Sequence, residues 1–143
     1  MAILRYLARE FSVPDYWYPK DSQRQARIDE FMAWQHLNLR MYGSMVFQSK
    51  IIIPLMKGEP PNQKSVAGYE KGLGQVLSQM ENIWLRENPF IAGKEMSIAD
   101  LLAVTELEQP GLERLLQHPL YSAWKSSCSL KRFLSLINRN GII

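Results

Sequence analysis

The sequence predicts an all-α fold, arranged as a helical bundle. Two long segments, residues 21–48 and 63–86, carry apolar side chains at the three- and four-residue steps of a helix with one buried face. A third segment, 97–107, opens with a helix-capping pattern and is apolar on most sides, which is typical of a buried central helix. Residues 51–53 are β-branched, but they are too few to found a sheet.

The composition is that of one globular domain. The chain has 143 residues, of which 46% are hydrophobic and 22% charged. Seventeen basic and fourteen acidic residues are spread without a basic block, so no nucleic-acid partner is expected. Cys128 is the only cysteine, which excludes an internal disulfide and favours a reducing, intracellular setting. No apolar run approaches the roughly 20 residues of a membrane helix, so no membrane partner is expected.

The first eleven residues are expected to form an amphipathic helix. Its apolar side holds Ile3, Leu4 and Leu7. The helix begins without a capping residue or a preceding loop, so it resembles the last turns of a longer helix. Its arginines give a weak mitochondrial-targeting pattern, which Glu10 and Asp15 oppose.

Residues 13–20 are expected to form a linker. Pro14 and Pro19 prevent a continuous helix through it. Tyr16, Trp17 and Tyr18 are too apolar for a free, solvated tether. Two interpretations stay open: the aromatic rings pack against the chain's own helices, or they pack at the joint between two domains.

The first long helix is expected to start at a cap formed by Asp21 and to run to about residue 48 or further. Gly43 weakens its middle by about 1 kcal/mol relative to alanine, and we expect a bend or a close approach there. A polar stretch, 34–40, interrupts the apolar stripe. Any chemistry on this helix is therefore expected within that stretch.

A loop is predicted over 54–62, followed by a second long helix over 63–86 that packs antiparallel against the first. Its buried stripe is expected to hold Val66, Tyr69, Leu73, Val76, Leu77, Met80, Ile83 and Trp84. Gly68, Gly72 and Gly74 are costly in an exposed helix, so we expect backbones to approach closely there. Beyond Pro110 and Gly111, short helices are expected over 112–117, from 119 and over 130–137.

The strongest local signal is the capping pattern at residue 97. Ser97 and Asp100 have the spacing of a capping box, in which each side chain accepts a hydrogen bond from the other residue's backbone N–H. Met96 and Leu101 have the spacing of a hydrophobic staple. We interpret Ser97 and Asp100 as structural capping residues that fix the start of a core helix, without a catalytic role.

Enzyme motifs are absent from the sequence. It has no phosphate-binding glycine loop, no paired metal-binding histidines and no nucleophile elbow, so no catalytic residue and no metal is assigned. His36 is more simply a packed or surface histidine than a catalytic base. Arg40 lies one turn after His36 and has two open interpretations. It could hold the carboxylate of a small ligand, or it could pair with Glu30 or another acid of the chain.

At this point the residues resemble a known family. Residues 13–19 (VPDYWYP), 27–30 (RIDE) and 33–36 (AWQH) resemble the theta class of cytosolic glutathione transferases. Gly93 with residues 97–101 (SIADL) is similar to the capping motif of that superfamily's C-terminal domain, and residues 105–110 (TELEQP) are also theta-like. The resemblance runs from residue 2 to about residue 124, while the tail 126–143 departs from it.

The resemblance implies a domain organisation. Family members join an N-terminal thioredoxin-like domain, which binds glutathione, to an all-α C-terminal domain. Residues 1–12 then match the remnant of the last helix of the first domain, 13–20 the interdomain linker, and 21–143 the C-terminal domain. The serine that activates glutathione belongs to the first domain, so no serine here takes its role. Uncovered, residues 2–11 and the linker aromatics are expected to form an exposed apolar patch that favours self-association.

The resemblance also implies a function and a site. The parent activity conjugates glutathione, as co-substrate and without a metal, to small electrophiles in the cytoplasm. The matching helix lines the second-substrate pocket and part of the dimer interface, which assigns substrate binding to Gln35, His36, Leu39 and Arg40. Arg40 matches an arginine near the glutathione site. The isolated chain is expected to be inactive. The alternative is a non-catalytic interaction or assembly module, against which the theta-like linker argues.

Overall fold

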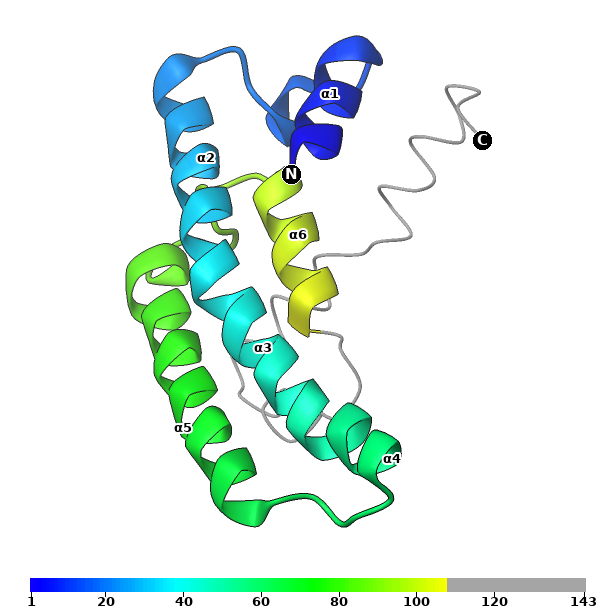
Figure 1. Ribbon diagram of the computed structural model, residues 1–143. Coiled ribbons are helices and arrows are strands. Elements are labelled where there is room, and N and C mark those ends of the chain that lie inside the picture. Colours follow the sequence, from blue (N-terminus) through cyan, green and yellow to red (C-terminus); the bar gives the residue numbers. More distant parts are fainter. Residues whose placement is uncertain (108–143) are drawn as a thin grey trace.

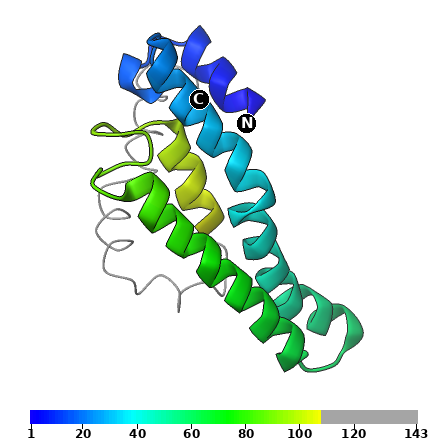
Figure 2. The ribbon, with the colours of Figure 1, turned by 90° about the vertical axis from the view of Figure 1, so that its left-hand side faces the viewer.

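The computed structural model describes residues 1–107, and these form a bundle of helices (Figure 1). Helices α2 (Ser22–Leu37) and α3 (Leu39–Phe47) follow one another along the bundle, and α5 (Gln63–Gln79) runs beside them in the opposite direction. Helix α6 (Ile98–Leu107) packs alongside α2 and α3 (Figures 1 and 2). The only β-type pairing in this part of the chain is an isolated bridge between Phe90 and Gly93. The all-α prediction is confirmed, whereas the helices expected beyond residue 111 lie outside the described residues.

Helix α6 contributes many of the buried residues of the hydrophobic core. Ile98, Ala99 and Ala103 are fully buried, as expected for a helix that is apolar on most of its sides. An aromatic cluster stands at the α2 side of this core, where Phe31 meets Trp84 edge to face at 5.1 Å between ring centroids. Within residues 1–107, every helix is too short or too polar to cross a membrane.

The first long helix is interrupted at Asn38, which contradicts the prediction of a continuous helix to residue 48. Asp21 caps α2 as expected, since its side chain accepts from the Arg24 N–H at 2.9 Å. At Asn38 the backbone leaves the helical region, with φ −117° and ψ −85°. The Asn38 side-chain amide donates to the carbonyl of Trp34 at 2.7 Å, and this is the carbonyl that the Asn38 N–H would bind in a helix. The side chain therefore replaces the backbone donor and separates α2 from α3.

The loop was predicted to begin at residue 54, but Pro54 lies inside a helix that ends at Lys57. A π-helix, η2 (Gln48–Ile52), extends α3, and α4 (Ile53–Lys57) follows it. The Ile53 N–H donates to the Gln48 carbonyl, five residues back, so the helix widens just before the proline. Pro54 then occupies the first turn of α4, which continues η2 without a break. Gly58 caps the end of the helix with a left-handed φ of 67°.

The second long helix starts at Gln63 and packs against the first, as predicted. Near its end one residue of the predicted buried stripe is exposed instead. Asn62 caps α5 by accepting from the Ser65 N–H at 3.1 Å. A π-helix, η3 (Met80–Leu85), continues it. Ile83 was expected in the buried stripe, but it is 52% exposed. The wider turn of η3 shifts the residues after Met80 around the helix axis, so the simple helical spacing fails there.

Close approach at the α5 glycines is confirmed only at Gly72. A Cβ atom added to Gly72 would lie 2.2 Å from Cε1 of the Tyr42 ring, whereas Gly68 and Gly74 face open space. The approaching group is thus a side chain of α3 rather than a backbone. Gly72 makes room for an aromatic ring at the α3–α5 contact.

The predicted N-terminal patch is half wrong. In the linker, which contains the short 3-10 helix η1 (Asp15–Trp17), Trp17 is 1% exposed and Tyr18 6%. Of the two interpretations of the linker, packing against the chain's own helices is therefore the one observed for these rings. Helix α1 (Ala2–Glu10) has no buried residue, and its outer side exposes Ile3 by 72% and Tyr6 by 59%.

Polar bonds hold the linker and α1 to α2. The Tyr18 hydroxyl donates to the Asp29 carboxylate at 3.0 Å, and the Arg5 guanidinium binds the same carboxylate at 2.8 Å. The Arg9 guanidinium lies over the Tyr18 ring, 5.2 Å from its centroid. Burial, together with the bond to Asp29 and its negative charge, raises the pKa of Tyr18 above its ordinary value of 10.0.

This raised pKa predicts a loss of stability in alkali. Because the folded pKa of Tyr18 lies above the unfolded one, its contribution is complete below about pH 10 and is lost as the pH rises through the folded pKa. Tyr18→Phe should cost about 1.5–3 kcal/mol at pH 7.5, the usual value of a bond to a charged group. Urea unfolding from pH 7.5 to 11 should show a smaller alkaline decline in this variant than in the wild type. Tyr6→Phe, at an exposed tyrosine, is the control; equal declines in all three proteins would contradict the prediction.

Substitution of Gly72 tests the α3–α5 contact. Gly72→Ala should destabilise the chain by about 1–3 kcal/mol, because the new methyl group overlaps the Tyr42 ring. Gly68→Ala, on an open face of the same helix, should instead stabilise it by about 0.5–1 kcal/mol. Urea unfolding of the two variants measures the difference. A stabilised Gly72→Ala would mean that α3 and α5 do not pack in this way.

Candidate functional site

The four residues assigned to substrate binding lie on two different faces of helices α2 and α3. Gln35 and Leu39 are buried, at 0% and 1% exposure, and face the core. His36 and Arg40 are exposed, and the break at Asn38 lies between them. The structure therefore places only these two of the four residues at the surface, on either side of that break.

Gln35 is a buried amide with an unmet acceptor. Its Nε2 donates to the Met32 carbonyl at 3.4 Å and to the Met1 sulfur at 3.6 Å, so it joins α2 to the start of α1. Its Oε1 has no hydrogen-bond partner among the described residues. A buried acceptor without a donor costs about 1–3 kcal/mol. Gln35 is thus a weak point of the α1–α2 packing.

Arg40 pairs with an acid of the chain, which is the second of its two open interpretations. Its Nη1 lies 3.7 Å from Oε1 of Glu106, near the C-terminal end of α6. Glu30, the other acid considered, instead binds Arg27 at 2.6 Å. The side chain of Arg40 remains 54% exposed, so the pair leaves about half of it open to solvent. Glu106 was not predicted from the sequence; its signal was a carboxylate near the end of a mostly apolar helix, beyond the capping Asp100.

Asp100 connects the start of α6 to the preceding loop. One carboxylate oxygen accepts from the Ser97 N–H and the Ser97 hydroxyl, each at 2.9 Å, and the other accepts from the Ile91 N–H at 2.9 Å. The Ser97 hydroxyl receives the Ala99 N–H at 3.3 Å, where the pattern had indicated the N–H of Asp100. The carboxylate therefore holds three donors and fixes both the helix start and the loop.

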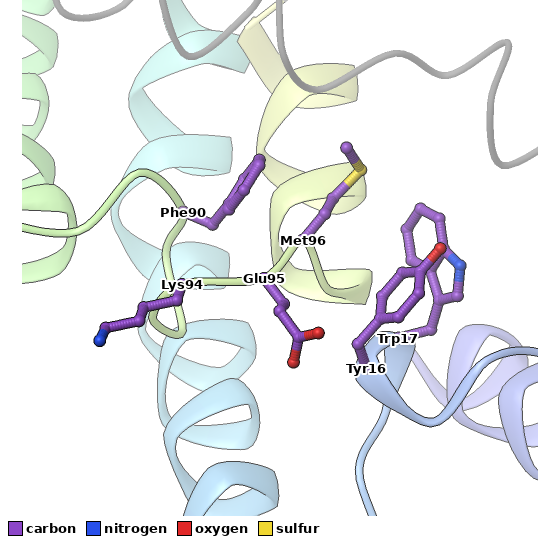
Figure 3. Close-up of a pocket in the computed structure, with 6 residues that line it drawn as sticks. All are labelled: Tyr16, Trp17, Phe90, Lys94, Glu95 and Met96. Carbon is purple, nitrogen blue, oxygen red and sulfur yellow. The ribbon is translucent and has the colours of Figure 1, made fainter.

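A cavity of about 240 Å³ lies where this loop meets the linker (Figure 3). Figure 3 shows Tyr16 and Trp17 on one side, facing Phe90 and Met96, while the Lys94 side chain extends away. Glu95 completes the lining, and its carboxylate binds Arg24 at 2.7 Å. None of the four predicted substrate-binding residues lines this cavity. Within residues 1–107, no group of three or more metal-ligating side chains gathers.

The bundle, the capped α6 and the exposed arginine together fit one class of protein. Residues 45–130 match the family model of the glutathione S-transferase C-terminal domain. The chain belongs to the glutathione S-transferase family. Its most similar relatives include theta-class enzymes, which confirms the resemblance found in the sequence.

The theta-class relatives match most of this chain. It is 38% identical to human glutathione S-transferase theta-1 over 128 residues, which cover 87% of this chain and 53% of the relative. It is 37% identical to chicken (Gallus gallus) theta-1 over 127 residues, which cover 87% of this chain and 49% of the relative. The chain thus spans about half the length of the curated relatives it matches.

Solved structures give the same result for the fold. Human glutathione S-transferase T1-1 in its apo form superposes with a TM-score of 0.82 and 35% identity, over 96% of this chain and 60% of that one. A human theta-class transferase in complex with the glutathione conjugate of 1-menaphthyl sulfate superposes with a TM-score of 0.82 and 31% identity, over 96% of this chain and 57% of that one.

The bonds of Asp100 predict a large effect of its removal. Asp100→Ala should cost about 3–5 kcal/mol, because the buried N–H groups of Ser97 and Ile91 lose their acceptor. Ser97→Ala should cost about 1 kcal/mol, as for other helix caps. Glu95→Gln, which breaks only an exposed ion pair, should cost less than about 1 kcal/mol. Urea unfolding ranks the three; an Asp100→Ala chain as stable as Glu95→Gln would contradict the assignment.

Proposed function

We propose that this chain is the C-terminal, all-α part of a theta-type glutathione transferase, an enzyme that conjugates glutathione to small electrophiles. The observation that carries the proposal is the extent of the similarity. The superposition on human theta-class structures covers 96% of the chain, so it extends beyond the bundle into the linker and α1. One of those structures holds a glutathione conjugate, which supports glutathione as the co-substrate.

The proposal gives each part of the chain a role. Residues 1–12 end a thioredoxin-like domain, 13–20 link the two domains, and 21–143 form the α-domain. The exposed outer side of α1, with Ile3 and Tyr6, supports this division because it offers an apolar surface to a preceding domain. The hydroxyl that activates the glutathione thiol then belongs to that domain, and the 143-residue chain alone is inactive. The enzyme is cytoplasmic.

The surface of α2 and α3 supplies the second-substrate wall in this proposal. Arg40 and His36 provide polar groups there, and Leu37 and Met41 lie beside them with 68% and 37% exposure. An apolar surface next to a cation suits an uncharged electrophile held against an anionic co-substrate. The wall acts by placing the two reactants, which can lower a bimolecular barrier substantially. The same helices contribute to a homodimer interface.

A second candidate function is an interaction module without catalysis. One observation favours it: Leu55 and Met56, at the end of α4, are 79% and 81% exposed. Adjacent exposed apolar side chains are common at protein-binding surfaces. A stable complex with another protein, together with no glutathione conjugation by a folded fusion that restores the preceding domain, would favour this function over the transferase.

Activity measurements on two proteins test the transferase proposal. The purified 143-residue chain should give no glutathione conjugation above a control that contains thiol and electrophile alone. A fusion that places the preceding half of human theta-1 in front of residue 2 should give clear turnover, since it restores the thiol-activating group. No turnover by a folded fusion would contradict the transferase assignment, and clear turnover by the chain alone would contradict its predicted inactivity.

Within the fusion, Arg40 should affect the use of glutathione. Arg40→Gln should raise the KM for glutathione several-fold, because it removes the charge of an arginine that matches one near the glutathione site of the family. Arg24→Gln is the matched control, since Arg24 is also an exposed, ion-paired arginine but lies in the first turn of α2, where it pairs with Glu95. Equal KM values for glutathione in the two variants would contradict the assignment of Arg40 to the site.

A further inference from the structure

The cavity between the linker and the loop before α6 takes no part in the proposed function, and its lining is mostly aromatic. Tyr16 and Trp17 stand on one side of it, opposite Phe90 and Met96 (Figure 3). The two linker rings lie 5.6 Å apart between centroids and are tilted by 35°. The volume is about 240 Å³, below the roughly 300 Å³ at which pockets for drug-sized ligands begin, so the cavity suits one small group.

The aromatic lining is held in place by the core. Trp17 is 1% exposed and Met96 7%, and both belong to the main cluster of buried apolar residues. Tyr16 and Phe90 are partly buried and pack against that cluster. Met96 directly precedes the capped start of α6, and Asp100 binds both that start and the loop that carries Phe90. The rings are therefore fixed before any ligand arrives, which keeps the entropic cost of binding small.

The charged groups at the cavity favour a cation inside it. In Figure 3 the Glu95 side chain lies toward the linker rings, whereas the Lys94 side chain extends away from them. Arg24 binds one Glu95 oxygen at 2.7 Å, but the described lining of the cavity includes Glu95 and not Arg24. The faces of aromatic rings carry partial negative charge and attract cations. A carboxylate and three aromatic rings thus make the cavity favourable for positive charge.

The same lining decides which kind of cation fits. A primary ammonium has three N–H donors, and a donor that is buried without an acceptor costs free energy. The rings and the Met96 thioether offer no strong acceptor, which leaves the Glu95 carboxylate and the Tyr16 hydroxyl among the described side chains. A quaternary ammonium group has no N–H donor and presents methyl groups at its surface. Its charge and its apolar surface therefore both match the cavity.

We propose that this cavity binds a quaternary ammonium group, such as that of choline. Tyr16, Trp17 and Phe90 would surround the cation, and Glu95 would be its counter-ion. Arg24, as the existing partner of Glu95, would compete with the ligand for that carboxylate. The four predicted substrate-binding residues lie outside the lining, so the inference does not depend on the proposed function.

Choline and its neutral isostere give the first test. In neohexyl alcohol a carbon atom replaces the choline nitrogen, so the shape is kept and the charge is lost. Both are titrated into the full 143-residue chain, and the NMR signal of the Met96 methyl group, identified with Met96→Leu, reports binding at the cavity. Choline should bind about five-fold more tightly than neohexyl alcohol, as expected for a partly exposed cation–π site. Equal affinities, tighter binding of the alcohol, or an unmoved Met96 signal would overturn the proposal.

The charged pair gives a second test, with opposite effects expected for its two members. Glu95→Gln removes the counter-ion and should weaken choline binding about three-fold, whereas Arg24→Gln removes the competing cation and should strengthen it. Neither variant should change the affinity for neohexyl alcohol. The matched control is Glu30→Gln, because Glu30 also pairs with an arginine, Arg27, but lies outside the described lining. Equal choline affinities in Glu95→Gln and Glu30→Gln would contradict the role of Glu95.

Tyr16→Leu tests the rings, since it removes one ring and keeps an apolar side chain. It should weaken the binding of choline more than that of neohexyl alcohol; equal losses would show that the ring only fills space and would contradict the cation site. The charge variants decide the proposal even if Tyr16→Leu does not fold.

Phosphatidylcholine vesicles distinguish the two sources of the quaternary ammonium group. Sedimentation of the chain with the vesicles, reversed by free choline, would identify a lipid headgroup as the ligand. Choline binding without such sedimentation would identify a free small molecule.

Discussion

The carboxylate of Asp100 is the interaction on which the arrangement of this domain depends. It is fully buried and binds the Ser97 N–H, the Ser97 hydroxyl and the Ile91 N–H. These bonds set where α6 begins, and α6 is the helix against which both α2 and α3 pack. A shift of its first turn would move Glu106 at its other end as well. The distance from Glu106 to Arg40 is thus set partly at the cap of α6.

Much of the fold could be predicted from the sequence because its signals are local. The cap formed by Asp21 and the spacing of apolar residues in α5 act over three or four positions. The errors arose where a side chain or a wider turn changes the helical register. Asn38 replaces a backbone donor, and η3 turns Ile83 to the surface; a pattern based on regular helical spacing contains neither effect.

The site was less predictable, because it depends on which helices become neighbours. The family resemblance pointed to Arg40, but its partner Glu106 comes from α6, far along the chain. Pairing across helices is fixed by packing, and no spacing rule relates the two positions. The burial of Gln35 was equally hidden, since residues 34–40 read as one polar stretch although the helix turns Gln35 inward and His36 outward.

The attachment of α1 has a consequence for how such a domain responds to its solvent. Helix α1 has no fully buried residue and packs only the partly buried Leu4 and Ala8 against the core, and the Arg5–Asp29–Tyr18 bonds tie it to α2. Ion pairs at the surface weaken as salt screens their charges, whereas an apolar core does not. Ionic strength should therefore loosen α1 well before it affects the bundle. The angle at which anything joined to α1 meets the bundle becomes a salt-dependent property.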